Sequence, residues 1–190
     1  MRLTLICLAL VSATSLSASD NELNLLVSKQ MTRDYSAADI SSDQPVGITL
    51  RYGRDLMGLG PAQLQLQAGY HAETSAELSG SGVTPSEKYK NSGYSLGLQA
   101  QWRLGVVLGA GAELRAERLQ SATYGSTTQI RPWITGRVGF SMPLPLVQPV
   151  FGLEVAVPVT SKSGDATSDE DVLKRISPNF EVSVYGGIRF

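Results

Sequence analysis

The sequence predicts an all-β protein, an eight-stranded antiparallel up-and-down β-barrel that crosses a membrane. Eight segments of about 9–13 residues alternate apolar and polar side chains with the period of two that a β-strand requires. Long polar connections alternate with short ones, as in barrels whose long loops share one side of the membrane. No segment has the length and apolar character of a transmembrane helix, so a membrane-embedded chain of this sequence has to close its strands into a barrel.

The first 18 residues predict a secretory signal peptide. A positive charge at Arg2 precedes an apolar run over residues 3–11, and small residues follow to Ala18. The run is shorter than the roughly 20 residues of a membrane-spanning helix. Cleavage after Ala18, or alternatively after Ser17, leaves residues 19–190 as one barrel domain.

Loss of the signal peptide also changes the composition of the chain. It removes Arg2 and the single cysteine, Cys7, and leaves 15 basic and 17 acidic residues, a net charge of −2. The mature chain then has no disulfide or cysteine metal site, and no basic excess that would indicate a nucleic-acid partner. A lipid anchor on Cys7 is the less favoured alternative, because this residue lies inside the apolar run and not behind it.

The first four predicted strands show the alternation plainly. In the third, Leu64 and Leu66 lie on one face while Gln63 and Gln65 lie on the other. In the first strand, Leu26 is an exception, because it shares the polar side. The four segments are residues 22–30, 45–55, 62–73 and 92–103, with connections at 31–44, 56–61 and 74–91.

The last four strands continue the pattern. Only Leu104 and Gly105 precede the fifth, and Pro132 in the sixth cannot donate to a strand ladder, so we expect a bulge or a strand end there. The eighth runs to Phe190 and is expected to pair with the first, which removes the last open edges. The segments are residues 106–118, 128–140, 147–159 and 179–190, with connections at 119–127, 141–146 and 160–177.

The polar faces of these strands carry a particular kind of charge, arginine with aspartate or glutamate and no lysine. The guanidinium fork matches carboxylates in a confined space, and the interior of an eight-stranded barrel is just wide enough for side chains to fill. We therefore predict a closed, charge-paired lumen. Its predicted members are Arg51, Asp55, Glu73, Arg103, Glu113, Arg115, Glu117, Arg131, Arg137, Glu154, Glu181 and Arg189.

The apolar faces have aromatic residues near the strand ends, which is typical of the girdles at membrane interfaces. The alternative is a soluble barrel of the lipocalin kind, with the apolar face inside around a ligand. The restriction of the polar face to balanced charges disfavours it. The aromatic residues are Tyr52, Tyr70, Tyr94, Trp102, Phe140 and Phe190.

On these features the chain resembles the small eight-stranded outer-membrane proteins of the OmpA/OmpX type of Gram-negative bacteria. The resemblance covers residues 19–190 and depends on the strand pattern and on Phe190, with no subfamily motif and no peptidoglycan-binding domain after it. It implies location in the cell outer membrane. It also implies that Phe190 and Ile188 belong to a terminal signal that the barrel-assembly machinery recognises after delivery by periplasmic chaperones.

Three motifs are candidates for chemistry. His71, the single histidine, could be the base of an outer-membrane lipid A deacylase, but that family has a His-x-Ser pattern and Glu73 stands two residues on. The acidic run at residues 164–171 could hold Ca²⁺, although solvated loop charge is favoured. The glycines at 105, 109 and 111 lie within a strand, which is the wrong context for a phosphate-binding loop.

The leading functional hypothesis is a non-enzymatic outer-membrane protein that displays four polar extracellular loops for envelope integrity, adhesion or defence. Its expected partners are outer-membrane lipids and lipopolysaccharide, with no cofactor, no metal and a monomeric state. A narrow channel for ions or small solutes is the alternative, and a lipid A-modifying enzyme is a further one.

Overall fold

The structure is a computed structural model that describes residues 20–32, 40–59, 62–80, 87–144, 146–160 and 168–190. The predicted signal peptide lies outside these residues, and so do residues 164–167 of the acidic run. No helix in the described ranges is long and apolar enough to cross a membrane.

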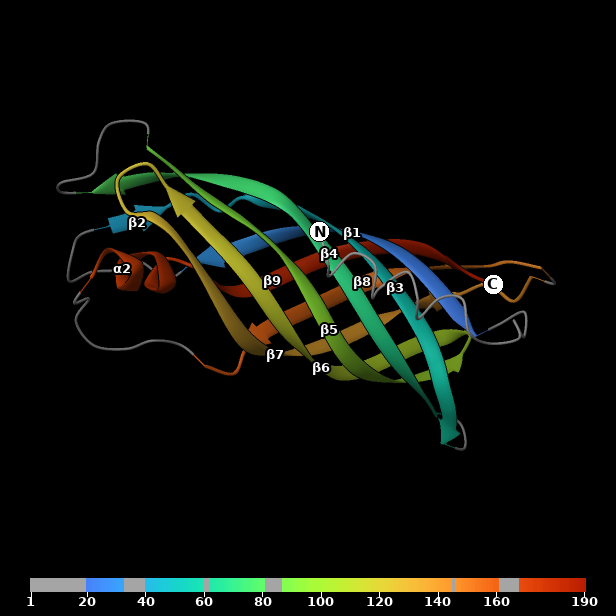
Figure 1. Cartoon of the computed structure of the whole chain (residues 1–190). Helices are drawn as coiled ribbons and strands as arrows, with labels where there is room; N and C mark the ends of the chain where they lie inside the picture. Colours follow the sequence, from blue (N-terminus) through green and yellow to red (C-terminus); the bar gives the residue numbers. More distant parts are fainter. Residues whose placement is uncertain (1–19, 33–39, 60–61, 81–86, 145, 161–167) are drawn as a thin grey trace.

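Eight tilted antiparallel strands close into a barrel (Figure 1), which confirms the predicted fold. Each strand pairs with its neighbours in the chain, and β1 pairs with β9 from Glu22 opposite Arg189 to Gln30 opposite Glu181. The predicted closing pair is therefore present. The barrel strands are β1 (Asn21–Thr32), β3 (Val46–Leu59), β4 (Ala62–Gly80), β5 (Lys88–Leu104), β6 (Val106–Ser121), β7 (Gly125–Ser141), β8 (Gln148–Pro158) and β9 (Pro178–Arg189).

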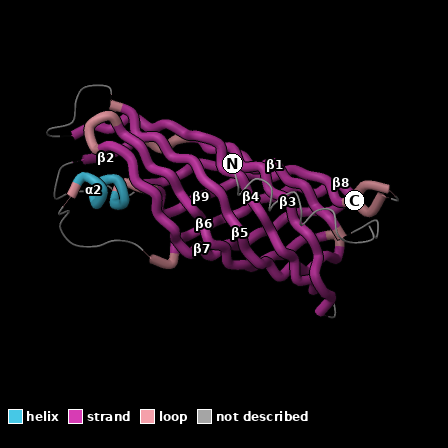
Figure 2. Tube along the Cα trace, in the orientation of Figure 1, coloured by secondary structure: helices cyan, strands magenta, loops and turns pink. Residues whose placement is uncertain are grey.

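The two ends of the barrel differ. The C-terminus and the short connections lie at one end, while the three-residue strand β2 (Ile40–Ser42) and the helix α2 (Asp169–Arg175) lie at the other (Figures 1 and 2). At the first end the backbone of Phe190 exchanges two hydrogen bonds with that of Asn21, at 2.9 and 3.1 Å. Gly105 has a φ of 83°, a left-handed conformation that lets β5 turn directly into β6. We call this end the inner end and the other the outer end.

The wall of the barrel is inverted relative to a soluble protein. Leu96 on β5 is 58% exposed, whereas Arg51 on β3 is 1% exposed and Gln65 on β4 is fully buried. Soluble proteins bury leucine and expose arginine. The soluble, lipocalin-like alternative is therefore wrong, and the apolar outer wall is suited to lipid.

Strands at the outer end are longer than predicted, and in β4 a β-bulge reverses the alternation. Between His71 and Thr74 the register of β4 against β5 shifts, so that Ala76 and Leu78 face inward while Glu73 and Glu77 face outward. The segments 74–91 and 119–127, expected as loops, are mostly strand where the structure describes them. In β7 the expected bulge at Pro132 is absent, since Pro132 pairs in register with Leu114.

The lengthened strands enclose a small apolar cluster at the outer end, which we call the outer plug. Helix α2 supplies its Leu173 and is followed by Ile176, so the connection expected as a polar loop is partly helical. Ser168 caps the helix by accepting a hydrogen bond from Asp171 N at 3.3 Å, and the acids at 169–171 form its first turn, where they suit the helix dipole. The outer plug consists of Ala76, Leu78, Tyr89, Leu119, Leu173 and Ile176.

Candidate functional site

The lumen is the part of the molecule in which charged groups converge, and it lies between the inner end and the outer plug. Every barrel strand contributes to it, because alternate residues of each strand point inward. Among the described residues, six arginines and six acids meet there as ion pairs. They are Glu22, Arg51, Asp55, Arg103, Glu113, Arg115, Glu117, Arg131, Arg137, Glu154, Glu181 and Arg189.

Two arginines share one carboxylate at the inner end. Arg103 donates to Asp55 at 2.7 Å and to Glu22 at 3.1 Å, and Arg189 also pairs with Asp55. Arg189 further donates to Gln63 Oε1 at 3.1 Å. Asp55 comes from β3 and Arg103 from β5, so the cluster ties together strands that are not neighbours in the barrel wall.

The middle of the lumen continues this chain of charges. Arg137 donates to Glu22 at 2.8 Å and to Glu154 at 3.1 Å, and Arg51 approaches the same Glu154 at 2.6 Å from the opposite wall. Arg137 also stacks over Tyr185, with its guanidinium carbon 4.3 Å from the ring centroid. Because the lumen pairs six arginines with six acids, neither sign of charge is in excess among them.

A second group of pairs lies nearer the outer plug. Arg115 donates to Glu113 at 2.5 Å and to Glu181 at 2.6 Å, while Arg131 pairs with Glu117 at 2.7 Å. Trp133, which is fully buried, lies between them, with the guanidinium carbons of Arg115 and Arg131 at 4.1 and 5.1 Å from its ring. The indole therefore occupies space that water would need to pass along this wall.

Glutamine side chains fill the remaining polar space beside β4 and β5. Gln67 donates to Gln65 and to Gln99, both at 2.8 Å, and Gln101 donates to Gln65 at 2.9 Å and to Gln99 at 2.6 Å. An amide both donates and accepts, so such a network satisfies buried polar groups without adding charge. These glutamines lie on the polar faces of the third and fourth predicted strands, and their amide network was not predicted.

The structure places eleven of the twelve predicted lumen charges inside the barrel. Glu73 is the exception and a correction: the bulge turns it outward, where it pairs with Lys90 at 2.8 Å on the exposed surface. Glu22 takes its place in the lumen. Glu22 was not predicted as a lumen residue, although it has the same parity as Asn24 and Ser28 on the polar side of β1.

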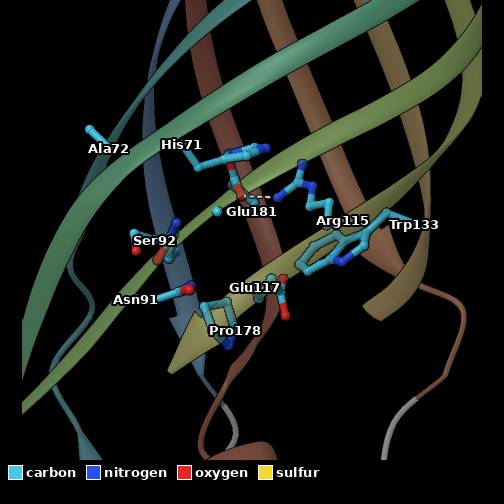
Figure 3. Close-up of a pocket in the computed structure, with 11 residues that line it drawn as sticks. His71, Ala72, Asn91, Ser92, Arg115, Glu117, Trp133, Pro178 and Glu181 are labelled. Carbon is cyan, nitrogen blue, oxygen red and sulfur yellow. Dashed lines mark hydrogen bonds and ion pairs between the residues drawn. The ribbon is translucent and has the colours of Figure 1, made fainter. Parts of the chain in front are cut away.

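A small cavity lies where the charged lumen meets the outer plug (Figure 3). Its volume of about 10 Å³ has room for one water molecule. Around it Gln30 Oε1, His71 Nε2, Asn91 Oδ1 and Trp133 Nε1 are buried without a hydrogen-bond partner among the described residues. A water molecule there can both donate to the amide oxygens and accept from the indole, which is what this set of atoms requires.

His71 points into this cavity and away from the lipid-facing wall. Its Nδ1 lies 2.9 Å from Thr49 Oγ1 on the neighbouring strand. The next acid, Glu73, is on the opposite face of β4. Within the described residues no three His, Cys, Asp or Glu side chains are grouped as a metal site.

The arginines and acids of the lumen therefore neutralise one another. Both Arg51 and Glu154 are about 1–2% exposed and paired with each other, so neither is open to a passing solute. Above them the outer plug covers the lumen with apolar side chains.

Comparison with known proteins supports the fold. No family model matches the sequence, and no curated protein is significantly similar to it. Among solved structures, Neisserial surface protein A is 15% identical, with a TM-score of 0.53 over 93% of this chain and 98% of that one. Ail, the attachment invasion locus protein of Yersinia pestis, is 15% identical, with a TM-score of 0.47 over 90% of this chain and 97% of that one.

At such identity, the similarity to Neisserial surface protein A shows the fold, which is that of a small outer-membrane β-barrel. The apolar wall and the closed ladder of strands meet the two demands that a bilayer makes on a spanning β-structure. The chain is therefore an outer-membrane barrel.

Proposed function

We propose that the chain is a non-enzymatic outer-membrane protein, in which a closed barrel anchors and displays the outer connections at the cell surface. The observation that carries the proposal is the lumen, in which the described charges are paired with one another and lie beneath an apolar plug. A channel needs polar groups that a solute can reach, whereas Glu113 and Arg115 are 5% and 3% exposed. The displayed connections would then serve envelope integrity, adhesion or defence.

The position of His71 disfavours the lipid A-modifying alternative. A lipid-modifying triad has to open toward the lipid, whereas His71 lies in the lumen against Thr49. Its neighbour by two positions, Glu73, faces the outside of the barrel. His71 and Glu73 therefore do not converge on one substrate.

The expected partners follow from the two surfaces. Outer-membrane lipids and lipopolysaccharide would contact the wall, and the barrel-assembly machinery, supplied by periplasmic chaperones, would recognise the strand that ends at Phe190. Since the strands close without a second chain, a monomer is sufficient.

Surface display is tested by labelling intact cells with a membrane-impermeant maleimide. Ala122→Cys places a thiol in the exposed β6–β7 turn at the outer end, and Gly58→Cys places one in the exposed β3–β4 hairpin at the inner end. A Cβ at Gly58 meets no atom within 4 Å, so the substitution is tolerated sterically. We expect labelling at position 122 in intact cells, and labelling at position 58 only after the outer membrane is permeabilised.

Labelling of Gly58→Cys but not of Ala122→Cys in intact cells would reverse the orientation and contradict display of the outer connections. If positions 58 and 122 were both labelled only after the cells are lysed, the outer-membrane location would be contradicted.

A further inference from the structure

The inner end of the barrel carries an exposed apolar surface at its turns. Two adjacent turns form it, the β5–β6 turn at Leu104 and Val106 and the β7–β8 turn after Phe140. Ser141 N donates to Gly105 O at 2.9 Å, so the two turns are joined. We call this surface the inner ledge; it consists of Leu104, Val106, Phe140, Met142, Leu144 and Leu146.

The inner ledge is unusually exposed for apolar side chains at a turn. Leu104 is 81% and Leu146 is 84% exposed. No Asp, Glu, Lys or Arg occurs in residues 104–112 or 138–153, so the turns and their flanks are free of charge. A turn in water normally consists of polar residues, and contiguous exposed apolar residues indicate a contact surface.

The ledge continues the lipid-facing wall without a break. On β5 the outward apolar residues run from Tyr94, whose ring lies 5.4 Å from that of Tyr70, to Leu104 in the turn itself. These ten steps at about 3.3 Å, with a tilt of about 40°, span about 25 Å along the membrane normal. That equals the height of the apolar band of an outer-membrane barrel, so β5 reaches the inner edge of the hydrocarbon only at its turn.

The β7–β8 turn extends further and is suited to a medium without water. Residues 143, 145 and 149 are prolines, which have no N–H group to satisfy. Met142 N donates to Pro149 O and Leu144 N donates to Met142 O, each at 3.0 Å. The N–H groups of Met142 and Leu144 are therefore satisfied, and a free donor is what makes irregular backbone costly in lipid.

We propose that the inner ledge is immersed in the inner leaflet of the membrane, where it binds the acyl chains of phospholipids. On this side the barrel then ends within the leaflet and does not project into the aqueous compartment. The β3–β4 hairpin on the other side of the inner end also exposes Leu56 and Met57, but it follows a charged residue on the outer wall, Arg54. The charge-free flanks of the ledge and its continuity with the lipid-facing wall favour a lipid as its partner over a second protein.

Fluorescent labels at single cysteines test this proposal on the purified chain refolded into phospholipid vesicles. Leu146→Cys and Leu104→Cys report on the ledge, Leu96→Cys on the wall and Ala122→Cys on water, each carrying a polarity-sensitive bimane. We expect the two ledge labels to behave like the label at 96, with blue-shifted emission, strong quenching by brominated lipid, and several-fold weaker quenching by iodide than at 122.

Ledge labels that are quenched by iodide as strongly as the label at 122 would overturn the proposal, and the ledge would then be a docking site for a protein of the aqueous side. A second variant needs no label. Leu146→Lys should lower the urea midpoint of unfolding relative to Ala122→Lys, because a charge in lipid is costly. Equal midpoints would contradict immersion.

Discussion

At the scale of single residues, the paired charges of the lumen stabilise the barrel only as long as both partners are present. Arg115 holds Glu113 and Glu181 at 2.5 and 2.6 Å. Its loss removes the ion pair of Glu181 and leaves Glu113 with only the longer contact to Arg51, at 3.6 Å. Breaking a buried pair in this way costs about 3–5 kcal/mol.

We therefore expect Arg115→Met to lower the free energy of unfolding by about 3–5 kcal/mol, measured by urea titration in lipid vesicles. The matched control is Lys90→Met, which breaks the Lys90–Glu73 pair on the outer surface, where both side chains are about half exposed. This control should cost at most about 1 kcal/mol. If the free energy of unfolding falls equally in the two variants, the burial of the lumen charges does not contribute to the stability of the barrel.

His71 tests the enzymatic alternative. Because its ring faces the lumen cavity, His71→Ala should leave the lipid A of the host unchanged, as seen by mass spectrometry of cells that produce either form of the protein. A change in lipid A that appears with the original protein and disappears with His71→Ala would instead assign catalysis to this residue.

At the scale of elements, helix α2 is expected to hold the outer plug in place. Leu173 is fully buried and anchors the helix on the plug. Leu173→Asp places a charge among apolar side chains, so the helix should detach and trypsin should cut after Lys174 or Arg175 while the barrel stays intact. In the control Asp169→Ala, at an exposed position of the first turn, these sites should stay protected, and equal cleavage of both variants would contradict the role of Leu173.

We expect β9 to be needed for insertion into the outer membrane more than for export across the inner membrane. Phe190 makes two backbone hydrogen bonds with Asn21 at the point where β9 meets β1. Deletion of Phe190 should reduce the folded, membrane-inserted fraction in cell fractionation while secretion across the inner membrane continues. Normal insertion of the truncated chain would rule out a terminal assembly signal.

The strands were predictable because one face of each meets lipid, which imposes a strict period of two from Leu64 to Tyr70 and from Phe180 to Ile188. Beyond the lipid this constraint ends. After the bulge at His71, Ala76 and Leu78 turn inward onto the plug, so the alternation continues with the opposite phase. A pattern followed without a shift therefore placed Glu73 in the lumen.

Helix α2 shows a different limit. Its seven residues have too few apolar positions to display a helical period, and Leu173 is buried only because β4, β5 and β6 bring their own plug residues to the same place. Tertiary packing therefore determines that this segment is helical and that Leu173 is buried. In the same way, the pairing of Glu22 with Arg103 and Arg137 depends on strand stagger around the closed barrel, which no local pattern contains.

At the scale of the whole molecule, the structure combines three zones, of which two are the outside and the inside of the barrel and the third lies at its outer end. The inner ledge and the wall are apolar outward, the lumen is charged and paired inward, and the outer plug is apolar inward beneath α2. The first two zones suit lipid outside and neutral polar packing inside. The third covers the lumen at the outer end.

The central claim is that this barrel is closed, and single-channel recording in planar bilayers tests it most directly. A barrel filled by paired Arg and Glu side chains and covered by the outer plug should add no conductance steps to the bilayer at high salt, in a membrane where a porin gives clear steps. Stable, uniform steps from the purified chain that change with Glu113→Gln would contradict the account and identify the lumen as a channel.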